Sequence, residues 1–136
     1  MPDKIKEVYK TDTTLNNIHY SWGWSLPATD IDCLLVEYKY PNNPTAIVEY
    51  KHENWNRNFE KGPIKALSTL SNKAELPFFI VIWNNNQTVT FKIFPMNDIA
   101  INKIKDYEIK YLYLRKEENI SEDSYIKFMK YIRGQK

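Results

Sequence analysis

The feature that most constrains the fold is an uninterrupted run of six apolar residues, Phe78 to Trp83, directly after Pro77. A half-exposed strand alternates apolar and polar side chains, whereas a strand covered on both faces is apolar throughout. We therefore predict a fully buried central strand over residues 78–83. A strand of this kind is typical of an α/β domain in which helices flank a central sheet in two or three layers.

The other predicted elements follow from apolar periodicity, turn residues and caps. A helix over 63–74, which Pro63 begins, separates the central strand from the hairpin before it and allows a parallel crossover, so the sheet should be mixed. The expected elements are a helix over 1–18, an extended aromatic segment over 19–24, strands over 32–40 and 45–51 joined by a Pro-Asn-Asn-Pro turn, the helix over 63–74, strands over 78–83 and 88–94, a short helix over 98–106, a strand over 108–115, and a last helix capped by Ser121 and closed by Gly134.

Composition narrows the class of protein. The 136 residues suit one domain, and the net charge of +2 gives no general attraction to polyanions. A single cysteine, Cys33, excludes an internal disulfide framework and a cysteine-based zinc site. No apolar run approaches the ~18 residues that span a bilayer, and the first ten residues lack the apolar core of a signal peptide. We therefore expect a reduced, cytoplasmic protein.

A short element, Val-Glu-Tyr-Lys, occurs twice, at 36–39 and 48–51. Because side chains alternate faces along a strand, the Glu and Lys of each triplet share one face. Pairing Tyr40 with Thr45 across the turn would place Leu34 opposite Lys51. In that register Asp32 lies on the same face as the second Glu and Lys, and the first Glu and Lys lie on the opposite face.

Two carboxylates and a lysine on one face suit metal-assisted hydrolysis. Asp32 and Glu49 could supply hard oxygen ligands for Mg²⁺, which keeps waters at its remaining positions. Lys51 could orient the attacking water and stabilise negative charge on a phosphoryl group. The alternative is a structural ion-pair cluster of the same three side chains.

The order of these residues resembles the PD-(D/E)XK nuclease superfamily. The matching order is a helix, Asp32 at the start of a strand, a hairpin, the Glu49–Lys51 triplet, a helix and a buried strand. The resemblance covers about residues 1–94, a restriction-endonuclease-like αβββαβ core, with 95–136 as a C-terminal elaboration. The segments PATDID, AIVEYKHE and LPFFIVIW are similar to small uncharacterised phage- or prophage-type members.

This resemblance implies a metal-dependent nuclease, with DNA as the expected substrate and Mg²⁺, or Mn²⁺ as a substitute, as the cofactor. Asp32 and Glu49 would be metal ligands together with the main-chain carbonyl of Tyr50, and Lys51 would be catalytic. Superfamily members often add an acidic residue from the first helix, for which Glu7 is the nearest candidate.

Substrate contacts are less specific in the sequence. Trp22 could stack on an unpaired base, although a place in the core explains it equally well. Lys61 and Lys65 could contact phosphates at the start of the helix over 63–74, where the alternative is a solvated helix end. A domain of this size has little surface for a long site, so we expect a homodimer or a partner protein. The alternative function is a catalytically silent nucleic-acid-binding or assembly protein on the same fold.

Overall fold

The computed structural model describes residues 28–39, 42–110 and 119–134. The chain divides into two compact units, Met1–Asp30 and Ile31–Lys136, and the second contains every described helix and strand. The predicted helix over 1–18 and the aromatic segment over 19–24 lie outside the described residues. The interpretation of residues 1–136 as one domain stays a prediction.

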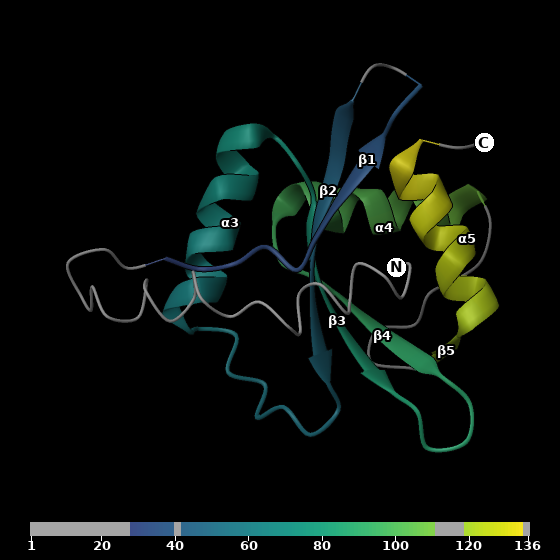
Figure 1. Ribbon diagram of the computed structural model, residues 1–136. Helices are drawn as coiled ribbons and strands as arrows, with labels where there is room; N and C mark the ends of the chain where they lie inside the picture. The colour runs from purple at the N-terminus through teal and green to yellow at the C-terminus, as the bar shows by residue number, and fades with distance from the viewer. Residues whose placement is uncertain (1–27, 40–41, 111–118, 135–136) are drawn as a thin grey trace. The chain divides into compact units, whose positions relative to one another are not determined.

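The second unit is built on a five-stranded mixed sheet with the spatial order β1-β2-β3-β4-β5 (Figure 1). Strands β2 and β3 are parallel, and every other neighbouring pair is antiparallel. The helix between β2 and β3 makes this parallel pairing possible, so the predicted mixed sheet is confirmed. The strands are β1 (Cys33–Glu37), β2 (Asn43–His52), β3 (Phe78–Asn84), β4 (Thr90–Pro95) and β5 (Ile120–Ser121).

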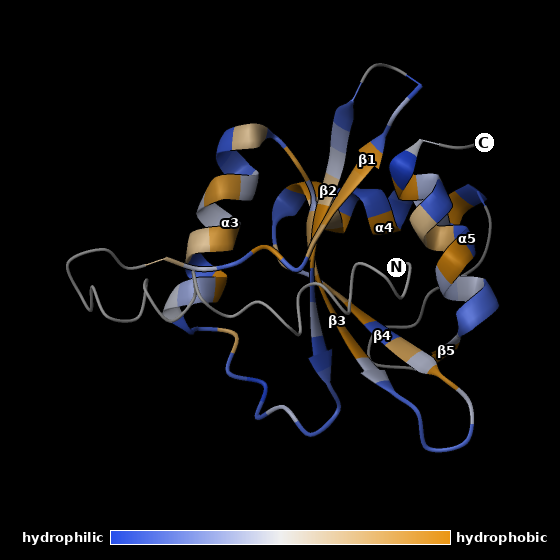
Figure 2. Cartoon of the chain, in the orientation of Figure 1, coloured by the Kyte–Doolittle hydropathy of each residue, from blue (hydrophilic) through white to orange (hydrophobic). Residues whose placement is uncertain are grey.

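Three helices of the described residues cover the two faces of this sheet. Helix α3 (Gly62–Ala74) packs on one face, and α4 (Asp98–Lys110) and α5 (Glu122–Arg133) pack on the other (Figure 1). The first five residues of β3 are at most 3% exposed, and β3 is the middle strand. The prediction of a fully buried central strand is therefore confirmed over residues 78–82, whereas Trp83, the last predicted residue, is only partly buried. Figure 2 shows this strand as part of the apolar centre.

Alternation along β2 and β3 divides the apolar side chains into two separate cores. Ala46, Val48, Phe79 and Val81 face α4 and α5, whereas Ile47 and its neighbours face α3. The core on the α3 face consists of Ile47, Ile64, Leu67, Phe78, Ile80, Ile82 and Phe94. Each face of the sheet thus buries its own apolar surface, as expected of a three-layer arrangement.

Helices α3 and α5 follow the sequence signals closely, with one error in the apolar stripe of α3. In α5, Ser121 accepts a hydrogen bond from Ser124 N–H (3.2 Å), and Gly134 ends the helix at φ 98°, which confirms both predicted caps. In α3 the apolar stripe was expected to include Leu70. Leu70 is 43% exposed, and Ser71 takes the buried position one residue later.

The predicted strand over 108–115 is wrong where the structure describes it. Helix α4 continues through Lys110, beyond the expected end at residue 106, because Ala100 and Tyr107 lie two turns apart on one buried face. Residues 111–118 lie outside the described part of the chain. The two-residue strand β5 was not predicted; it pairs with the start of β4 just before α5.

A buried asparagine joins three elements around the start of β3. Asn97 is 8% exposed, and its Oδ1 accepts hydrogen bonds from Ala100 N–H (2.9 Å) and Phe78 N–H (3.2 Å). Its Nδ2 donates to the Leu76 carbonyl (2.9 Å) and to Asn72 Oδ1 (3.1 Å). One side chain therefore caps α4 and connects it to the end of α3 and to the central strand.

Candidate functional site

The β1–β2 hairpin has a different register from the expected one. Leu34 pairs with Ile47 and not with Lys51, a shift of four residues along β2. The shift arises because β1 ends at Glu37 and β2 already begins at Asn43, with a bulge after Leu35. Because the shift is an even number of residues, it leaves every side chain before the bulge on its predicted face.

Asp32 lies directly beside the second triplet. Its Oδ2 accepts a hydrogen bond of 3.0 Å from Tyr50 N–H, the middle residue of Glu49-Tyr50-Lys51. Cys33 pairs with Val48, so the next pair in the same register is Asp32 opposite Glu49. The N–H and C=O of one residue point the same way in an extended strand. The Tyr50 carbonyl is therefore directed to the same edge of β2 as the Asp32 carboxylate.

Glu49 is an acidic residue in an apolar row. Its side chain is only 7% exposed, and it follows Ile47 on the α3 face of β2. Across the parallel pairing it lies opposite Ile80, which is fully buried. A carboxylate in such surroundings loses hydration that a surface carboxylate keeps, so its position costs stability unless polar groups compensate.

Lys51 follows Glu49 on the same face, opposite Ile82. Its ammonium lies 5.6 Å from the ring centroid of Trp55, within the range of a cation–π contact. Trp55 is itself held, because its backbone N–H donates to the His52 carbonyl (2.9 Å) and its ring meets the Phe59 ring edge-on, with the centroids 5.0 Å apart. The aromatic contact restricts where the ammonium can lie.

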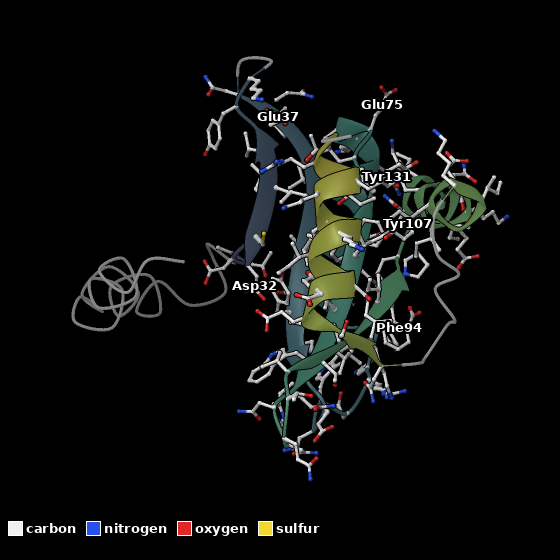
Figure 3. All side chains as sticks on the ribbon, turned by 90° about the vertical axis from the view of Figure 1, so that its right-hand side faces the viewer. Asp32, Glu37, Glu75, Phe94, Tyr107 and Tyr131 are labelled. Atoms are coloured by element: carbon white, nitrogen blue, oxygen red, sulfur yellow. The ribbon has the colours of Figure 1, made fainter. Side chains whose placement is uncertain are left out.

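The first triplet has different surroundings. Glu37 Oε2 lies 3.7 Å from Arg133 Nε on α5, and Glu37 Oε1 accepts a hydrogen bond of 2.8 Å from Lys39 N–H. Tyr38 is 74% exposed beyond the end of β1. Asp32 and Glu37 mark the opposite ends of β1 in Figure 3. The structure therefore separates two identical tripeptides, as the alternation argument predicted.

The side chain of Tyr50 points away from Asp32 and anchors β2 to α5. Its hydroxyl lies 2.6 Å from the hydroxyl of Tyr125, and both line a pocket of about 240 Å³ with Cys33. Burial raises the pKa of both tyrosines above the ordinary value. Burial also raises the pKa of the Cys33 thiol, and the negative charge of Asp32 raises it further. These groups stay protonated at neutral pH.

The remaining sequence candidates have separate positions. Lys65 Nζ lies 3.3 Å from Glu60 Oε2, so its charge is shared with a carboxylate. Lys61 precedes α3, and its carbonyl accepts the Lys65 N–H (3.0 Å). Glu7 and Trp22 lie outside the described residues.

The donors near the second triplet fit a hard divalent cation. They are the carboxylate of Asp32, the carboxylate of Glu49 and the main-chain carbonyl of Tyr50, all oxygen ligands of the kind that Mg²⁺ prefers. Within residues 28–39, 42–110 and 119–134, no three His, Cys, Asp or Glu side chains gather as a metal-binding group. Because Mg²⁺ keeps several waters and needs only one or two carboxylates, this donor set is compatible with it.

Sequence reasoning missed the residues that surround Lys51. Trp55 and Phe59 belong to the α3 core, and Arg57 lies over the ring of Phe94 at 5.7 Å. A signal was present, since aromatic and basic residues alternate with asparagine, a common turn former, over residues 54–59. The positions of these side chains depend on the turn after β2, whose geometry the sequence does not specify.

Comparison with known proteins adds no family. No family model, curated protein or solved structure matches the chain. None of the helices in the described part of the chain is long and apolar enough to cross a membrane.

Proposed function

We propose that this protein is a metal-dependent nuclease that hydrolyses phosphodiester bonds in nucleic acid, with DNA as the expected substrate. The observation behind the proposal is the hydrogen bond from Tyr50 N–H to Asp32, which brings the lone aspartate to the Glu49–Lys51 triplet. The order on which the resemblance to PD-(D/E)XK nucleases rests also supports it. A hairpin with Asp32 at its start is followed by α3 and by a buried strand parallel to β2.

Each residue in this proposal has a defined task. Asp32, Glu49 and the Tyr50 carbonyl would hold Mg²⁺, which supplies Lewis-acid stabilisation of the phosphoryl oxygens when bound. Lys51 orients the attacking water and offsets negative charge that develops on the phosphate. Burial of Glu49 keeps competing water away from one side of the site. Tyr50 uses its side chain only to fix β2 against α5.

Asp32→Asn separates the structural task of this residue from the chemical one. The amide oxygen can still accept the Tyr50 N–H, so the hairpin should keep its stability, but one negative charge is lost from the donor set. We expect the variant to lose cleavage of plasmid and single-stranded DNA in Mg²⁺ or Mn²⁺ by at least about a hundredfold. It should also lose the rise in melting temperature that Mg²⁺ gives to the wild type by mass action.

Glu37→Gln is the matched control, because it removes one charge from the first triplet at the other end of β1. It should cleave as the wild type does and keep the Mg²⁺-dependent thermal shift. Metal-dependent cleavage that survives Asp32→Asn would disprove the site. A wild type that cleaves neither DNA nor RNA in any divalent metal would disprove the nuclease and favour a protein that binds nucleic acid without turnover.

A further inference from the structure

The α3 face of the sheet presents two cations on one aromatic cluster, defined here as Trp55, Phe59 and Phe94. The ring centroids of Trp55 and Phe59 are 5.0 Å apart, and those of Phe59 and Phe94 are 5.5 Å apart. The Lys51 ammonium lies 5.6 Å from the Trp55 ring, and the Arg57 guanidinium lies 5.7 Å from the Phe94 ring. A contiguous set of rings therefore supports both positive groups at the carboxyl end of β2.

Arg57 is the exposed member of this pair. It lies in the polar segment between β2 and α3 (Figure 2), and its φ of 58° places it in the left-handed region. Residues other than glycine rarely adopt this backbone conformation. The Arg57 carbonyl accepts the Phe59 N–H at 3.0 Å, which fixes the turn that directs the guanidinium over Phe94.

The acidic residues of the same segment do not neutralise Arg57. Glu60 pairs with Lys65 at 3.3 Å, and Glu53 Oε1 accepts a hydrogen bond from Asn86 Nδ2 at 3.4 Å. Across the described ranges, no carboxylate oxygen lies within 4.0 Å of the Arg57 guanidinium nitrogens. The Arg57 guanidinium is therefore free to bind an anion from solvent, and it shares one aromatic cluster with the Lys51 ammonium.

We propose that Arg57 binds a backbone phosphate of the nucleic-acid substrate, adjacent to the phosphate at Lys51. This inference rests on the proposed nuclease function. It adds a second contact with the substrate, to a phosphate that does not react. A guanidinium presents a planar set of donors that matches two phosphate oxygens, and the ring beneath it limits the entropy lost on binding. Such a contact positions the strand and adds no base specificity.

The test measures binding of a fluorescein-labelled single-stranded oligonucleotide and of a labelled duplex, with Ca²⁺ in place of Mg²⁺, at several salt concentrations. Arg57→Gln should bind roughly tenfold more weakly at low salt, and its log–log salt slope should fall by about one. Arg57→Lys keeps the positive charge but loses the planar set of guanidinium donors. It should therefore keep the salt dependence of the wild type and bind about threefold more weakly. In Mg²⁺, Arg57→Gln should raise KM and leave kcat within about twofold, because the phosphate that Arg57 binds is not the one that reacts.

Lys73→Gln is the matched control, since it removes one exposed charge from the last turn of α3, at the opposite end of β2 and β3. It should leave the slope unchanged. A wild type that cleaves DNA while Arg57→Gln keeps the wild-type affinity and slope would overturn this inference and leave the nuclease intact. Equal losses in Arg57→Gln and Lys73→Gln would also overturn it, because they would indicate a general charge effect. A wild type that neither binds nor cleaves nucleic acid would overturn the proposed function and this inference with it.

Discussion

Replacing the lysine of each triplet distinguishes a reactive site from surface charge, because Lys51 and Lys39 have the same local sequence. Lys51→Ala removes an ammonium held 5.6 Å from the Trp55 ring and half-buried on the Glu49 face. The cation–π contact contributes about 0.5–1 kcal/mol to the free energy of unfolding. Loss of water positioning should cost at least about a hundredfold in rate, which is about 2.7 kcal/mol of activation free energy. The expected loss of rate therefore exceeds what partial unfolding could cause.

Lys39→Ala should change very little. Lys39 is exposed beyond β1, and its main-chain N–H, which alanine retains, donates to Glu37. We expect a change in unfolding free energy within about 0.5 kcal/mol and a rate within about threefold of the wild type, a difference near 0.6 kcal/mol.

The assay combines initial rates on supercoiled plasmid and on a labelled single strand, in Mg²⁺, with urea unfolding of each variant. Unfolding gives the folded fraction, so a rate lost through instability is corrected before the two variants are compared. If Lys39→Ala were the inactive variant, the assignment of the site to the second triplet would be wrong. If both variants cleaved equally, neither lysine would act in the reaction.

Two further predictions concern stability. Asn97→Ala should lower the unfolding free energy by about 3 kcal/mol, because it removes the α4 cap and leaves the Phe78 N–H and Leu76 carbonyl without their partner. Asn72→Ala, which loses only the outer bond of this network, should cost about 1 kcal/mol or less in the same urea titration. The second prediction concerns Tyr50 and Tyr125, whose pKa values are raised by burial. The contribution of these two hydroxyls to the free energy of unfolding is therefore complete at pH values below about 10, the pKa of tyrosine in the unfolded chain. It falls as the pH rises above that value. Tyr125→Phe should show a shallower loss of unfolding free energy between pH 9 and 11 than the wild type, and an equal slope would contradict the raised pKa.

The layers of the fold were accessible from the sequence because they depend on periodicity. The apolar run over 78–83 determined the central strand, and Ser121 and Gly134 determined the ends of α5. The segment from residue 108 was ambiguous, since its apolar residues satisfy an alternating pattern as well as a helical one. Burial of Tyr107 extends α4 into that segment, and such a tertiary contact has no local signature.

The face of the candidate site was predictable, whereas its register was not. Alternation places Asp32 with Glu49 for any even shift, so an error of four residues in the hairpin left the grouping unchanged. The length of the hairpin loop and the bulge after Leu35 set the actual register, and alternation along the strands specifies neither. The contact between Lys51 and Trp55 depends in turn on the bend after His52.

Glu49 gives a physical reason to expect chemistry at this point of the sheet. Strand β2 is otherwise apolar where it is buried, over Ala46 to Val48, and the facing residue Ile80 is fully buried. An apolar residue at position 49 would extend the α3 core and avoid the desolvation of a carboxylate, but it would also remove the polar interaction that Glu49 makes. Proteins accept strained or desolvated groups mainly where function requires them. A Glu49 variant that is folded but inactive is the pattern expected of a residue present for its chemistry, which is what the proposed nuclease requires of Glu49.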